Sequence, residues 1–223
     1  MSIAAQAIIR RVVDTLQDAT SVRWAVAELV RYLNDGQREV VLQRPDAVSK
    51  TIAFMCAPGS RQSLPRDGAK LLDIPRNLAS MSTKRSLRIV SRELLDAQIP
   101  GWRSSTGSVD IIHFIYDPRE PRVFHVYPPA TSSAQLEIIY AAFPTDIDEP
   151  ASNATYTAVE GDISLPDIFA NALQNYILYR AYDKDSEFAG NSQRAQAHYA
   201  LFASALSVEV SSTVGAGPKL AGT

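Results

Sequence analysis

The sequence predicts an α+β fold: an antiparallel helical bundle built from both chain ends, with an inserted β-sandwich or barrel-like domain. Apolar residues recur at helical spacing in the first 45 residues and again after residue 164. Between about residues 50 and 145 the period changes to two, and Pro-Gly, Asp-Gly and Asp-Pro pairs separate short runs. Neither terminal helix pair can bury its apolar stripe alone, so the two pairs are expected to pack together.

The N-terminal segment 1–45 is expected to form a helical hairpin. Its first stripe is Ile8, Val12 and Leu16, and its second comprises Val26, Leu29, Val30, Leu33 and Val40. Pro45 ends the second helix, because proline lacks an N–H and its ring clashes with the preceding turn.

Segment 46–158 is expected to be the inserted β-rich domain with its linker. Alternating runs predict strands over 51–56, 71–74, 109–116, 123–127 and 136–143, and a short helix over 92–98. The last run is apolar on both faces, which indicates a buried strand. Residues 144–158 are acidic, small and contain proline, which is linker composition.

Segment 159–207 is expected to supply the C-terminal helices of the bundle. Ser164 is a plausible N-cap with Pro166 in the first turn, and Ala195, Tyr199, Phe202 and Leu206 mark the last helix. Segment 208–223 consists mainly of small and polar residues. It has too few apolar side chains to form a core of its own, so it is expected to be a flexible arm.

The composition bounds the function. Twenty-two basic and twenty-four acidic residues give a net charge of -2 and a pI near 5.9. This charge argues against a protein whose main function is to bind nucleic acid. Cys56 is the only cysteine, so no intrachain disulfide and no thiolate zinc site can form. No run approaches the roughly 18 apolar residues that cross a bilayer. We expect a cytoplasmic protein when it is made, without membrane contact.

Motifs for chemistry are absent: there is no phosphate-binding glycine loop and no nucleophile elbow. His113 and His125 lie on neighbouring predicted strands near Asp110 and Asp117, and only the strand register decides whether the imidazoles share a face. His198 has no acidic residue four positions away. We therefore expect no catalytic residue, no metal and no cofactor.

The densest basic segment contains Lys84, Arg85, Arg88 and Arg92. It is either a solvated face or a contact for a polyanion or an acidic partner. No aromatic residues are interleaved with it, so a stacking platform for single strands is not indicated.

Five segments carry a resemblance to a known family. They are RWAVAELVRYLNDGQREVVLQRPDA (23–47), APGSRQSLPRDGAKLLDIPRN (57–77), RELLDAQIPGWR (92–103), IYDPREPRVFHVYPP (115–129) and LPDIFANALQNYILYRAYDKDSEFAGNSQRAQAHYALF (165–202). In this order they resemble the head-to-tail adaptor (head-tail connector) proteins of tailed bacteriophages. Family members often have Ser or Thr where this chain has Ala25, so its second helix is expected to begin earlier, at Thr20 or Ser21.

The resemblance implies a structural virion protein and not an enzyme. It implies a subunit of a homo-oligomeric ring, twelvefold, that joins the portal protein to a tail or nozzle protein and lines the DNA conduit. Packaged DNA would pass through without sequence-specific binding, and the protein would occupy the host cytoplasm before assembly and then the virion. The arm would dock on the portal through Val208, Val210, Val214, Lys219 and Leu220, whose valines alternate with polar residues as in an added strand.

Two other classes stay open. One is a virion binding module of the β-sandwich type for carbohydrate or protein, favoured if Trp102, Tyr116 and Tyr127 line one groove as exposed aromatics. The other is a metal-dependent hydrolase that uses the histidines with Asp110 or Asp117.

Overall fold

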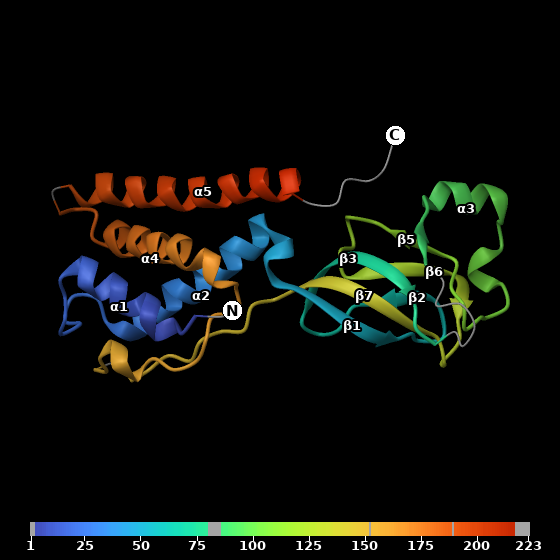
Figure 1. The fold of residues 1–223 in the computed structure, drawn as a ribbon, viewed down its shortest axis with the longest axis horizontal. Helices are drawn as coiled ribbons and strands as arrows, with labels where there is room; N and C mark the ends of the chain where they lie inside the picture. Colours follow the sequence, from blue (N-terminus) through green and yellow to red (C-terminus); the bar gives the residue numbers. More distant parts are fainter. Residues whose placement is uncertain (1–2, 80–85, 152, 189, 217–223) are drawn as a thin grey trace. The chain divides into compact units, whose positions relative to one another are not determined.

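The computed structural model describes residues 3–79, 86–151, 153–188 and 190–216 of the chain. These residues divide into two compact units: a helical unit of residues 1–47 and 144–223, and a β unit of residues 48–143. The fold is α+β, with five α-helices and two sheets in the described part (Figure 1). No described helix is long and apolar enough to span a membrane.

The helical unit contains four of the helices: α1 (Ala5–Leu16), α2 (Val26–Gln43), α4 (Ala170–Lys184) and α5 (Asn191–Ala216). The predicted stripes of α1 and α2 are buried, because their apolar residues lie three or four positions apart on one helix face. Aromatic side chains fill the space between helices. The ring centroids of Tyr176 and Phe202 are 5.1 Å apart, and Trp24 meets Tyr182 edge-on at 6.4 Å.

The turn between α1 and α2 is organised by Asp18, not by a helix cap. The Asp18 carboxylate accepts hydrogen bonds from the backbone N–H groups of Val22, Arg23 and Trp24, at 2.8 to 3.1 Å. These bonds lower the pKa of Asp18, although desolvation by burial opposes them. The expectation of an earlier helix start is wrong: α2 begins at Val26, and its N-cap residue is Ala25, whose methyl group cannot accept a hydrogen bond.

Helix α5 continues to Ala216, so residues 208–216 have helical backbone where the composition predicted a flexible arm. The remainder of that segment, with Lys219 and Leu220, lies outside the described residues. Extending an existing helix by one residue costs far less than starting one, so α5 can include these residues despite their composition.

Residues 144–169 connect β7 to α4 as an irregular segment that contains the short 3-10 helices η3 (Tyr156–Ala158) and η4 (Asp167–Phe169). The buried Asn34 side chain fixes this segment. Its Nδ2 donates to the carbonyl oxygen of Ile147 at 2.9 Å, and its Oδ1 accepts from the Ile147 N–H at 2.9 Å. The Ser164 N–H donates to the Gln37 Oε1 at 2.8 Å.

The predicted N-cap at Ser164 is wrong. The Ser164 hydroxyl accepts from the Thr145 N–H at 2.9 Å, which closes the two ends of the irregular segment. The α-helix begins only at Ala170, after η4, whose N-cap residue is Pro166.

The described residues of the β unit form seven strands in two sheets. One sheet has the order β1 (Ser49–Met55), β7 (Gln135–Ala142), β3 (Gly68–Asn77). The other has the order β2 (Gly59–Ser63), β6 (Val123–Ala130), β5 (His113–Tyr116), β4 (Arg88–Ile89). The barrel alternative is wrong, because the described strands do not close into one sheet. Strands β2 and β4 were not predicted, since neither shows an apolar alternation.

Two more buried amides fix the loops of the β unit. Gln62 bonds both the N–H and the carbonyl of Ala57, at 2.8 and 2.7 Å. Asn77 does the same for Ile111, at 2.9 and 2.8 Å. Helix α3 (Arg92–Gln98) lies where the sequence predicted it, and the Ser91 hydroxyl caps it by accepting from the Leu94 N–H at 3.2 Å.

Replacing Phe202 by alanine is expected to lower the free energy of unfolding by about 3 to 5 kcal/mol, the usual range for a buried aromatic. Phe202 is fully buried, whereas its neighbour Leu201 is 55% exposed. Leu201→Ala is therefore the matched control and should change stability by about 0.5 kcal/mol or less. Urea unfolding followed by circular dichroism measures both; equal losses would contradict the assigned packing.

Asn34→Ala should cost about 1 to 3 kcal/mol per backbone group that it leaves buried and unbonded. The control is Asn171→Ala on α4, because Asn171 is exposed. Hydrogen exchange should localise the effect, with faster exchange of the Ile147 amide in the Asn34 variant alone. Unchanged protection of Ile147 would show that the amide clamp is dispensable.

Candidate functional site

The described part of the β unit has a groove of about 1000 Å³ beside α3. Its walls come from α3, from the 3-10 helix η2 (Trp102–Ser104), and from the ends of β5 and β6 with the turn between them. The lining residues are Ser91, Arg92, Glu93, Asp96, Trp102, Arg103, Ile115, Tyr116, Asp117, Pro118, Arg119, Glu120, Val123 and His125. Most of them are polar or charged, so the groove suits a polar ligand or a peptide more than an apolar molecule.

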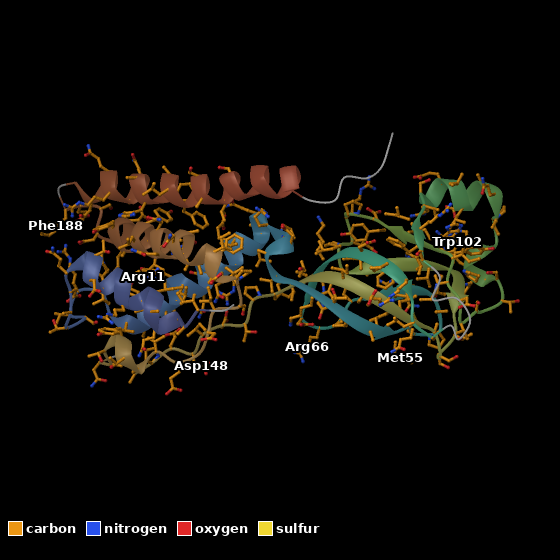
Figure 2. All side chains as sticks on the ribbon, viewed as in Figure 1. Arg11, Met55, Arg66, Trp102, Asp148 and Phe188 are labelled. Atoms are coloured by element: carbon orange, nitrogen blue, oxygen red, sulfur yellow. The ribbon has the colours of Figure 1, made fainter. Side chains whose placement is uncertain are left out.

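Trp102, which is labelled in Figure 2, is one of the residues that line this groove. It is fully buried and forms a small core with Leu95 and Ile115. Its indole N–H donates to the Asp96 Oδ1 at 2.8 Å, and the Arg103 guanidinium lies 4.3 Å from its ring centroid. The core therefore joins α3 and η2 to the face of β5.

Asp96 is the electrostatic centre of this arrangement. The bond from Trp102 is the largest cause that lowers the pKa of Asp96; desolvation opposes it, and Arg103 and Arg92 reinforce it. The Arg103 Nη1 is 3.1 Å from its Oδ1, and the Arg92 Nε is 3.5 Å from its Oδ2. Sequence reasoning missed Asp96 and Arg103, although the four-residue spacing of Arg92 and Asp96 on a helix was a usable signal.

The strand register places His113 and His125 on one sheet face. Tyr116 pairs with Phe124, so His125 lies opposite Ile115 and His113 lies opposite Tyr127, two residues away along the strands. The His113 ring stacks on Tyr127 with centroids 6.4 Å apart, and His125 meets Trp102 edge-on at 6.1 Å. Both imidazoles thus serve aromatic packing.

Four polar atoms of these residues and their chain neighbours are buried and have no hydrogen-bond partner among the described residues: the Nδ1 atoms of His113 and His125, the Tyr116 hydroxyl and one Asp110 oxygen. Burial lowers the pKa of His125, with contributions from Arg103 and Arg61, and burial raises the pKa of Tyr116 together with the charge of Asp117. Within the described ranges, no group of three His, Cys, Asp or Glu side chains could hold a metal ion.

The basic segment is only partly described, since Lys84 and Arg85 lie outside the described residues. Arg88 begins β4 and is exposed, and Arg92 begins α3. The Arg92 side chain lines the groove, so this segment and the groove are neighbours.

The three aromatics considered for a carbohydrate platform are not arranged as one. Trp102 is fully buried, while Tyr116 and Tyr127 are half-buried. Sugar-binding platforms need exposed ring faces, and Trp102 offers none. Cys56 is buried too, and burial raises the pKa of its thiol to about 11, so it packs as a small apolar residue.

A second hollow, of about 620 Å³, lies in the helical unit where the α1–α2 turn meets the α4–α5 turn. The Arg23 guanidinium lies between Trp24 and Phe188, 5.0 and 4.4 Å from their ring centroids, and it pairs with Asp185. Asn191 donates to the carbonyl oxygen of Asp185 at 3.1 Å. These contacts join the two turns and account for the charged groups there.

Stability should fall as the pH decreases from 7 to 5. Burial lowers the pKa of His125 and of His198 below 6.5, so the unfolded chain takes up these protons first and is favoured as the pH falls below about 6.5. His125→Gln and His198→Gln should each reduce the difference between melting temperatures at pH 7.5 and 5.5. A double variant with the full wild-type difference would contradict this assignment.

The comparison with protein families identifies the family to which the chain belongs. The family model for the SU10 adaptor protein matches residues 3–219, which include nearly all of both units. No curated protein matches the sequence. A match over this length identifies the family, so the chain belongs to the SU10 adaptor proteins, a family of phage head-tail adaptors.

Proposed function

We propose that this chain is the subunit of a head-to-tail adaptor ring, twelvefold, that docks on the portal protein and joins it to a tail or nozzle protein around the DNA conduit. The observation that carries the proposal is the family match over residues 3–219. A structural adaptor of a virion must contact other virion proteins. Two compact units in one chain provide two chemically different surfaces for such contacts.

The charges of the two units support this proposal. Residues 48–143 contain twelve Lys and Arg and eight Asp and Glu, a net charge of +4; the other residues contain ten and sixteen, a net charge of -6. An acidic surface repels the phosphate backbone and lets DNA slide past, whereas a basic one retains it. We therefore assign the conduit lining to the helical unit.

The proposed division of labour follows the chain. Segments 1–45 and 159–207 form the antiparallel bundle, segment 46–158 is the inserted domain with its linker, and segment 208–223 is the arm that docks on the portal. The docking residues in it are Val208, Val210, Val214, Lys219 and Leu220. Because the backbone of residues 208–216 is helical, the arm would dock as a continuation of α5 and would need less ordering than a free tail.

The basic residues Lys84, Arg85, Arg88 and Arg92 are proposed as a contact for an acidic partner protein. The exposure of Arg88 and the net charge of the β unit support this role. Packaged DNA would pass without sequence-specific binding.

Mixing the full chain with the portal protein of the same phage should give a closed ring on the portal, visible by electron microscopy. A chain truncated after Leu206 should keep its melting temperature and no longer co-sediment with portals. Many arms on one ring act at high effective concentration, so their joint loss is expected to be large although each binds weakly.

A control variant keeps the arm and changes a neighbouring exposed site: Leu201→Ala should co-sediment as the wild type does. Truncated chains that decorate portals at normal occupancy would show that docking comes from another surface. Portals that bind no full-length chain would refute the adaptor assignment itself.

A further inference from the structure

The described part of the basic segment combines positive charge with exposed apolar side chains. We call Arg88, Ile89, Arg92 and Leu94 the basic patch. Both arginines are exposed, Ile89 is 63% exposed and Leu94 is 46% exposed. Arginine beside accessible apolar side chains is typical of surfaces that bind other proteins, where arginine is enriched and lysine is depleted.

The positive charge of the basic patch is not neutralised within the β unit. Residues 84–98 contain four basic and two acidic side chains. One of the two acids, Asp96, is also held by the Trp102 indole and by Arg103. Among the described residues, Arg88 forms no ion pair. The patch therefore attracts an acidic surface.

The helical unit carries the opposite charge in one continuous stretch. The irregular segment 144–169 contains six Asp and Glu residues and no Lys or Arg. Two of the six pair with arginines of α2. Asp148, Glu160 and Asp167 are exposed, and no basic side chain of the described ranges pairs with them.

Asp148, which is labelled in Figure 2, lies beside Glu160. The Ile147 Cδ1 atom is 3.6 Å from the position that a Cβ atom added to Gly161 would occupy. Together with the hydrogen bond that joins the two ends of the segment, this contact shows that its two halves run side by side. Two neighbouring carboxylates repel each other, and a basic surface placed over them relieves the repulsion.

We propose that the basic patch binds the irregular segment 144–169 of the next copy of this chain in the ring. This inference rests on the proposed function and names the acidic partner of the basic residues. Ile168, which follows Asp167 and is 62% exposed, gives that segment an apolar side chain for Ile89 and Leu94 to contact.

The symmetry of a ring agrees with this pairing. Neighbouring copies in a closed ring meet through two different surfaces, one facing each neighbour. The β unit has a net charge of +4 and the rest of the chain one of -6. A contact between unlike units of two copies is therefore attractive, whereas a contact between like units is repulsive.

The test uses two variants, each of which reverses the charge of one partner surface. The first carries Arg88→Glu and Arg92→Glu, and the second carries Asp148→Lys and Glu160→Lys. Each variant alone should occupy portals roughly tenfold less than the wild type or worse, because like charges then meet at every contact of the ring. Co-sedimentation and electron microscopy of nuclease-treated proteins measure the occupancy.

An equal mixture of the two variants should recover the occupancy of the wild type. In a ring with alternating copies, the reversed patch of one variant meets the reversed segment of the other, and the two unchanged surfaces also meet. A charge contact within one chain would not be restored by mixing.

The matched control carries Arg66→Glu and Lys70→Glu, because both residues are exposed in the β unit outside the basic patch. It should occupy portals as the wild type does. All three variants should keep the melting temperature of the wild type, since exposed charges contribute little to folding.

Normal occupancy by either variant alone, or a mixture that remains as poor as its components, would overturn the inference. A patch that binds DNA instead would leave the occupancy of the first variant unchanged in nuclease-treated proteins and would weaken its retention of added DNA. A wild-type chain that forms no ring on the portal would refute the proposed function itself, so the two failures are distinguishable.

Discussion

Buried carboxamide side chains are the interaction on which both units depend. Asn34, Gln62 and Asn77 each bond the N–H and the carbonyl of a single residue in a segment without regular structure, namely Ile147, Ala57 and Ile111. A buried backbone group without a partner costs as much as a lost hydrogen bond. A carboxamide presents N–H donors and a carbonyl acceptor in one plane, so it can bond the N–H and the carbonyl of one residue as a neighbouring strand would. These amides therefore satisfy backbone groups of connecting segments that lack a neighbouring strand.

Regular elements could be predicted from the sequence wherever the apolar period was clear. This holds for α3, for the stripes of α1 and α2, and for β7, which is the central strand of its sheet. The period of apolar residues predicts nothing where hydrogen bonds of side chains determine the course of the backbone. Ser164 has the residue type of a helix cap but closes the irregular segment, and the polar strand β2 exists because Gln62 and the pairing with β6 hold it.

The arrangement of the candidate site could be predicted from the sequence only in part. The sequence left the placement of His113 and His125 open, because a one-residue change of register moves a side chain to the other face. The observed register puts them on one face, covered by Trp102 and Tyr127. Asp96 was overlooked because its role depends on Trp102 and Arg103, which approach it only after α3 has folded onto the sheet. Composition alone does not predict the helical backbone of residues 208–216, because an existing helix can extend through residues that could not start one.

The place of the β unit within the chain has a consequence for divergence. It enters after residue 47 and leaves before residue 144, so both junctions lie within one helical unit. The entropic cost of closing a loop grows only with the logarithm of its length, about 0.6 kcal/mol for each doubling. Inserted domains of very different size therefore lower the folding stability of the helical unit by nearly the same amount. One half of the protein can change its partners rapidly under selection while the other half keeps an old set of contacts.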